Sequence, residues 1–231
     1  MGFLLEGFGR AVWLLFSGDG ETWGAVFLSL WTSLSALALA TVIAAPLGTF
    51  VGLVRPRGSA ILVVIFRVGM SMPTVVIGLV VWGLLSSKGP LGGMELLYTP
   101  IAIVIGQTLL ALPIVASLTQ ASAASLDPTV YETVRMLGGG NAIAVRTALS
   151  ETRRELTVAV LSAFGRCITE LGIALAVGGS LRYYTRTLPA LVTLETSRGE
   201  FARAMAPGLI LVFLACGAAV IAPLLSRESR R

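Results

Sequence analysis

The sequence contains no histidine and a single lysine, Lys88. Without histidine the chain lacks the commonest general base and the commonest metal ligand, so a histidine-dependent catalytic triad is excluded. A phosphate-binding P-loop needs Gly-Lys followed by Ser or Thr, whereas Lys88 lies between Ser87 and Gly89. We therefore expect no catalytic residue, no metal site and no bound cofactor in this chain.

Cysteine and charged residues are also scarce. Cys167 and Cys216 fall in apolar segments and form no CxxC motif, which favours small buried residues over a redox or metal site. Charged residues make up 13% of the chain and hydrophobic residues 55%, with a mean hydropathy of +0.88. Although the net charge is +5, the arginines are dispersed among apolar blocks, which argues against nucleic-acid binding. This composition is typical of a polytopic all-α membrane protein.

Apolar residues gather in segments long enough to cross a bilayer, which takes about 20 residues. Five transmembrane helices are predicted, at residues 25–54, 60–85, 100–119, 156–178 and 207–225. Charges interrupt residues 1–22 too often for a span, so an amphipathic helix on the membrane surface is predicted there, with a poorly formed extra span as the alternative. Residues 23–225 would form the transmembrane domain, and residues 226–231 a basic tail.

The longest polar interval lies at residues 127–154. Asp127 and Pro128 suit the start of a helix, because Asp caps the first N–H groups and Pro has no N–H to leave unpaired. Val130, Val134 and Leu137 then recur at helical spacing on one face. Three glycines follow, and Asn141 could cap a second helix. A helix of about 10 residues is too short to cross a membrane, so we interpret it as a surface for a soluble partner.

A second polar interval, residues 180–206, contains LPALVTL, which is too short to span. We expect a re-entrant or interfacial helix starting at Pro189. Basic residues are more numerous on the side of the membrane that would hold the 127–154 loop and the C-terminus, which predicts that both are cytoplasmic.

The predicted fourth span carries two ionisable residues, Arg166 and Glu170, four positions apart. Charges at membrane depth are costly, so the two are expected to pair. They could be a structural pair that fixes helix packing or a gate in a transport pathway, and the residues do not decide between these. Gly178 and Gly179 later in the span favour close approach between helices.

Several stretches resemble one family. The pattern Glu132-Thr133-Val134-x3-Gly138 resembles the Glu-Ala-Ala-x3-Gly coupling motif of ABC importer permeases, with Thr and Val in place of the two alanines. TSLSALALATVIAAPLG, MPTVVIGLVV and QTLLALPIVAS in the first three spans look like the same family. FGRCITELGIALAVGGSLRYYTRTLPALVTLETSRGEF is similar to the tungstate branch of the molybdate, tungstate and sulfate permeases.

The resemblance implies a homodimeric permease subunit in the cell membrane that imports an oxyanion by alternating access. It implies two copies of a separate ATPase, which would bind ATP and Mg²⁺, and an extracytoplasmic oxyanion-binding protein. The coupling helix would contact the ATPase through Tyr131, Glu132, Arg135, Leu137 and Gly138. Arg166, Glu170, Gly178 and Gly179 are candidates for the pathway, the gate or helix packing.

Other functions remain open from the sequence. An ion-coupled secondary transporter would need an intramembrane carboxylate, for which Glu170 is the candidate. The permease of an ABC importer for a different solute, or a membrane assembly factor that transports nothing, would also fit. Tungstate, molybdate and sulfate carry the same charge, so no physical argument from the sequence chooses among them.

Overall fold

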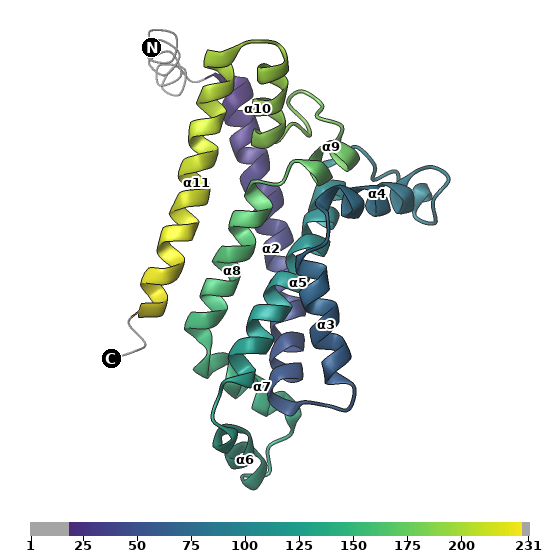
Figure 1. The fold of residues 1–231 in the computed structure, drawn as a ribbon. Coiled ribbons are helices and arrows are strands. Elements are labelled where there is room, and N and C mark those ends of the chain that lie inside the picture. Colours follow the sequence, from purple (N-terminus) through teal and green to yellow (C-terminus); the bar gives the residue numbers. More distant parts are fainter. Residues whose placement is uncertain (1–18, 228–231) are drawn as a thin grey trace. The chain divides into compact units, whose positions relative to one another are not determined.

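The computed structural model describes the backbone of residues 19–227 and the side chains of residues 19–221, and within this range the regular structure is entirely helical (Figure 1). The all-α prediction is confirmed. Most of the predicted N-terminal segment and the end of the basic tail lie outside these residues. The helices are α2 (Gly20–Val54), α3 (Ser59–Met70), α4 (Thr74–Leu85), the 3₁₀ turn η1 (Gly92–Met94), α5 (Pro100–Ala124), α6 (Pro128–Met136), α7 (Asn141–Glu151), α8 (Arg153–Ile168), α9 (Gly172–Gly178), α10 (Leu188–Ser197) and α11 (Phe201–Arg227).

Three helices in the described part of the chain, α2, α5 and α11, are long and apolar enough to cross a membrane. Two broken pairs, α3 with α4 and α8 with α9, raise the number to as many as five. The α2 helix has 35 residues. At 1.5 Å per residue it is about 50 Å long, which exceeds the roughly 30 Å hydrocarbon core. It begins at Gly20 rather than at residue 25, so residues 20–22 of the predicted surface segment belong to the α2 helix.

Two of the predicted spans are interrupted. The 60–85 segment breaks at Ser71–Pro73, where Pro73 occupies the N-cap position of α4 with extended backbone angles. A proline disfavours helical geometry in the residue before it, which accounts for this break. The 156–178 segment breaks at residues 169–171, although it contains no proline. Tertiary contacts must therefore stabilise the second break.

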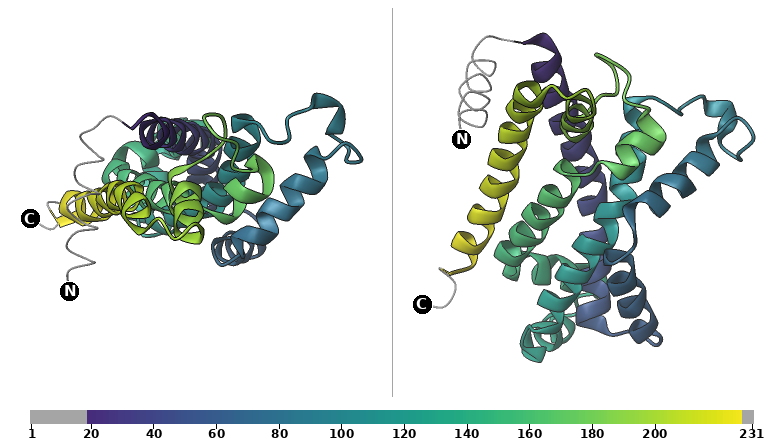
Figure 2. Two further views of the ribbon diagram at one scale, coloured as in Figure 1. Left: turned by 90° about the horizontal axis from the view of Figure 1, so that it is seen from above. Right: turned by 45° about the horizontal axis from the view of Figure 1, so that its top comes forward.

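The chain divides into two compact units, to each of which α2, α5, α8 and α11 contribute a segment. The described part of the first unit comprises residues 19–36, 73–107 and 165–217. Within it, α4 packs closely on α9, because a Cβ at Gly78 would lie 3.0 Å from the Ala176 Cβ. The α10 helix lies beside α2 and α11 (Figures 1 and 2), with Leu188 and Leu191 buried against Ala25 and Val26.

The described part of the second unit comprises residues 37–72, 108–164 and 218–227. Ala44, Gly48 and Gly52 recur every four residues along α2 and are buried. A Cβ at Gly48 would overlap the Ala116 carbonyl oxygen, and one at Gly52 the Gln120 carbonyl oxygen. Small residues thus let the backbones of α2 and α5 touch, which is how helices associate when lipid removes the hydrophobic driving force.

This contact generates a stability prediction. Gly52→Val should lower the free energy of unfolding in detergent by about 1–3 kcal/mol, because the new side chain has to push α5 away. Gly24→Val is the matched control on the same helix, since a Cβ at Gly24 has nothing within 4 Å. Thermal unfolding of the two purified variants checks the prediction, and equal midpoints would contradict it.

Candidate functional site

The start of α6 follows the sequence prediction. Asp127 Oδ1 accepts a hydrogen bond of 2.9 Å from the Thr129 N–H, and Pro128 is the first helical residue. The hydrogen bonding from Thr129 holds the pKa of Asp127 below its ordinary value of 3.8, so the capping carboxylate stays charged at neutral pH. The negative charge lies at the positive end of the helix dipole, which also stabilises this end.

The end of α6 is a Schellman motif built on Gly138. Gly138 has φ +80°, its N–H donates to the Arg135 carbonyl at 3.1 Å, and the Gly139 N–H donates to the Val134 carbonyl at 2.8 Å. Arg135 adds a bond of 3.3 Å from Nη1 to the Gly139 carbonyl. Only glycine adopts this left-handed conformation without strain. The backbone turn at the end of α6 therefore explains why the predicted motif has a glycine at position 138.

The α6 side chains face two ways. Val134 is buried, while Met136 and Leu137 are 79% and 83% exposed. The prediction that Val134 and Leu137 lie on one face of the helix was wrong, because Leu137 follows the last helical residue. Glu132 and Arg135 are also exposed, and Tyr131 is half-buried.

Tyr131 ties α6 to the next helix, because its hydroxyl donates to Asn141 Oδ1 at 3.3 Å. The prediction that Asn141 caps α7 was wrong: Gly140 is the N-cap residue and Asn141 is the first residue of the helix. Figure 1 shows α6 protruding at one end of the second unit, beyond α7.

A cavity of about 150 Å³ lies against α6, lined in part by Arg55, Asp127, Tyr131 and Glu132. Arg55 has φ +48°, and its Nη2 donates to the Ala124 carbonyl at 3.1 Å. It thereby joins the end of α2 to the end of α5, just before α6 begins. Arg55 was not predicted as a site residue from the sequence.

The other predicted site residues lie in the first unit. Arg166 Nη2 is 3.7 Å from Glu170 Oε2, so the expected pair forms, although at a long distance. Glu170 is 3% exposed, whereas the Arg166 side chain is 48% exposed. Gly178 is buried with Ile103 against it, and Gly179 has φ +67° and packs on the Tyr98 ring. Close packing accounts for Gly178, and a left-handed turn accounts for Gly179.

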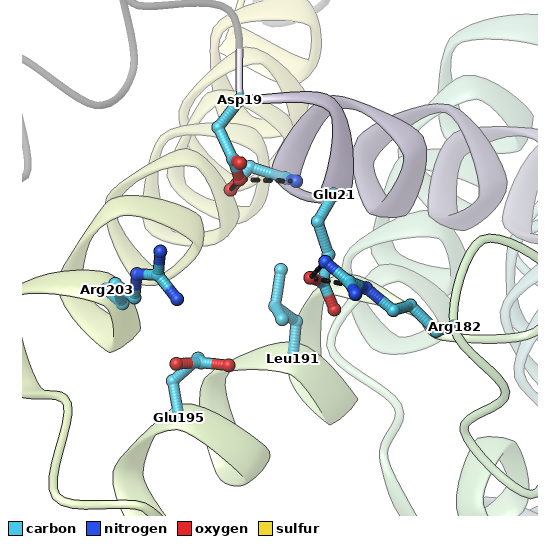
Figure 3. Close-up of a pocket in the computed structure, with 7 residues that line it drawn as sticks. Asp19, Glu21, Arg182, Leu191, Glu195 and Arg203 are labelled. Atoms are coloured by element: carbon cyan, nitrogen blue, oxygen red, sulfur yellow. Dashed lines mark hydrogen bonds and ion pairs between the residues drawn. The ribbon is translucent and has the colours of Figure 1, made fainter.

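A charged cluster in the first unit contains ion pairs that were not predicted from the sequence (Figure 3). Glu21 at the start of α2 forms ion pairs with Arg182 and Arg186, and Arg198 Nη1 donates to Glu195 Oε1 at 3.0 Å.

A cavity of about 60 Å³ lies beside these ion pairs. It is lined by Asp19, Glu21, Arg182, Glu195 and Arg203, and Arg203 points into the same space as Glu195. The sequence separation of these residues left no local signal for the cluster.

Comparison with known proteins identifies the family. The chain is 35% identical over 214 residues to the tungstate uptake system permease protein TupB of Peptoclostridium acidaminophilum, covering 93% of this chain and 94% of the relative. It is 34% identical over 213 residues to TupB of Campylobacter jejuni, covering 92% and 89%. The molybdenum transport system permease protein ModB of Escherichia coli is 25% identical over 221 residues, covering 90% and 95%. No protein-family model matches the chain.

The chain belongs to the ABC importer permeases of the tungstate and molybdate type. The resemblance seen in the sequence is therefore confirmed, and with it a multi-pass membrane protein. A multi-pass membrane protein accords with the long apolar helices α2, α5 and α11. The roles of the individual site residues stay predictions.

Within this permease, the Glu21 ion pairs should support the first unit. The Arg186 side chain is 13% exposed, so Glu21→Gln would leave its charge largely buried without a counter-charge. We expect a loss of about 3–5 kcal/mol of unfolding free energy, the usual result of breaking a buried pair from one side.

Thermal unfolding in detergent is the measurement, with exposed Glu200→Gln as the control. The double variant Glu21→Met, Arg186→Met should recover much of the loss, because it removes both members of the pair. A double variant no more stable than Glu21→Gln would contradict this account.

Proposed function

We propose that this chain is the translocating permease subunit of an ATP-driven importer for an oxyanion, and that the oxyanion is tungstate. The proposal rests on sequence identities of 35% and 34% to two tungstate uptake permeases, each over about nine-tenths of the chain. The more distant ModB relatives make molybdate the nearest alternative. The chain itself performs no catalysis in this scheme, because its sequence has no P-loop.

The partners follow from this role. Two copies of an ATPase subunit bind ATP and Mg²⁺, two copies of this chain form the path through the membrane, and an extracytoplasmic binding protein delivers the anion. The 127–154 loop and the C-terminus lie on the cytoplasmic side, where the ATPase is. Transport proceeds by alternating access, with ATP binding and hydrolysis driving the change between the two openings.

The contact with the ATPase is assigned to α6, the coupling helix. Exposed Met136 and Leu137 supply apolar contact area, and Glu132 and Arg135 supply charges beside it. The Asp127 cap and the Gly138 turn fix both ends of the helix, and Tyr131 holds it to α7. A rigid helix of this kind passes movement on, whereas a flexible loop would absorb it.

Substitution of the exposed α6 residues tests the contact. Leu137→Asp should reduce the amount of ATPase that co-purifies with the tagged permease by about tenfold, since a buried interface contact is worth 1–2 kcal/mol or more. Glu132→Lys should lower uptake per ATP hydrolysed. Glu151→Lys is the matched charge reversal, on an exposed residue of α7 in the same polar interval. Normal ATPase recovery with Leu137→Asp would refute the assigned contact.

The substrate is tested with the complete complex in proteoliposomes. ATP hydrolysis and uptake are measured with the binding protein loaded with tungstate, molybdate or sulfate. We expect the largest stimulation and uptake with tungstate. A larger response to molybdate or sulfate would keep the importer and reject tungstate, and no ATPase association under any condition would reject the function itself.

A further inference from the structure

The break in the fourth span, between α8 and α9, exposes backbone groups that a continuous helix would pair. In an unbroken helix the Cys167 carbonyl would accept from the Leu171 N–H, and the Ile173 N–H would donate to the Thr169 carbonyl. Residues 169–171 are not helical here. Cys167 and Ile173 are each 0% exposed, so neither group has access to solvent.

Two side chains replace the missing backbone bonds. Gln107 Nε2, from α5, donates to the Cys167 carbonyl at 3.1 Å, and the Glu170 N–H donates to the same oxygen at 3.1 Å. On the other side of the break, Glu170 Oε1 accepts from the Ile173 N–H at 3.2 Å. Without Glu170 the buried Ile173 N–H would lose this partner, and an unpaired backbone group in such surroundings costs several kcal/mol. The Cys167 carbonyl would keep the Glu170 N–H without Gln107, so Gln107 adds a second bond that stabilises the bent form.

Glu170 therefore has a role beyond its pairing with Arg166. Its Oε1 caps the first turn of α9, while only Oε2 faces Arg166, at 3.7 Å. The short, buried bond is the one to the backbone, and the ion pair is long and reaches an arginine that is half exposed. A neutral side chain of the same shape would keep the bond to the backbone.

Only one of the two polar atoms of the Gln107 side-chain amide is hydrogen-bonded within the described part of the chain. Its Nε2 is bonded to Cys167, but its Oε1 is buried without a hydrogen-bond partner in the described part of the chain. Such a half-satisfied amide is costly to bury, which lowers the free energy needed to release it. On release, the Cys167 carbonyl would be available to the Leu171 N–H, its partner in a continuous helix. Release of Gln107 would therefore weaken the bent arrangement relative to a continuous helix.

We propose that Gln107 and Glu170 are positioning residues that hold the fourth span in its broken form and set the direction of α9 during transport. The α9 helix packs on α4 at Gly78 and ends at the Gly178–Gly179 turn. A change at the break would therefore move α9, α4 and this turn together within the first unit. This proposal rests on the import function proposed above and adds the side chains that control the span.

The test uses the complete complex in proteoliposomes, with uptake per ATP hydrolysed as the readout. Gln107→Met and Glu170→Met should each lower this ratio by about tenfold, within the usual range of coupling between sites. Gln120→Met makes the same chemical change elsewhere on α5 and should leave the ratio unchanged. Glu170→Gln should retain most of the wild-type ratio, because its amide oxygen still accepts from Ile173.

A second readout is independent of transport. Amide hydrogen exchange across residues 171–175 should be faster in Glu170→Met than in wild type and unchanged in Glu170→Gln. A normal coupling ratio in Gln107→Met, or a defect in Glu170→Gln as large as in Glu170→Met, would overturn the proposal. If the wild-type complex imports no oxyanion, the import function fails, and the exchange comparison still decides the role of Glu170.

Discussion

Backbone hydrogen bonding in a medium without water is the constraint on which this structure depends. A helix in lipid pairs its own N–H and C=O groups, so every interruption requires side chains that replace the lost bonds. At residues 169–171 the substitutes are Gln107, which reaches the break from α5, and Glu170, which lies within the break itself. Just after the end of α2, Arg55 donates to the final carbonyl of α5, at an exposed position. Several polar side chains in this apolar chain therefore pair with backbone groups at the ends of helices.

Small residues allow helices to pack closely along their uninterrupted parts. Gly48 and Gly52 let α2 touch α5 in the second unit, and Gly78 lets α4 touch α9 in the first. Because lipid contacts apolar side chains as readily as protein does, close backbone approach supplies the attraction that water supplies elsewhere. Large apolar residues such as Phe27, Val42 and Phe213 are correspondingly left on the exposed faces, each more than 70% exposed.

Local features were predictable from the sequence, and tertiary ones were not. Asp127, Pro128 and Gly138 each act through neighbours within a few residues, and the ends of α6 were predicted from them. The break at residues 169–171 was not predicted, because Glu170 was considered only as a partner of Arg166 and Gln107 lies 60 residues before the carbonyl it binds. Glutamine in an otherwise apolar span was the available signal. Glu21 was likewise interpreted as a charge that prevents insertion, since its two arginine partners come more than 160 residues later.

That last separation has a consequence for synthesis in the membrane. Glu21 leaves the ribosome 161 residues before Arg182. At about 5–20 residues per second, the carboxylate waits roughly 8–32 seconds for its partners. During that interval its charge has to remain in water or the headgroup layer, so α2 first inserts with its leading turn held at the surface. The first unit extends to Gly217 in α11, so the start of α2 enters the bilayer region long before it can reach its final packing.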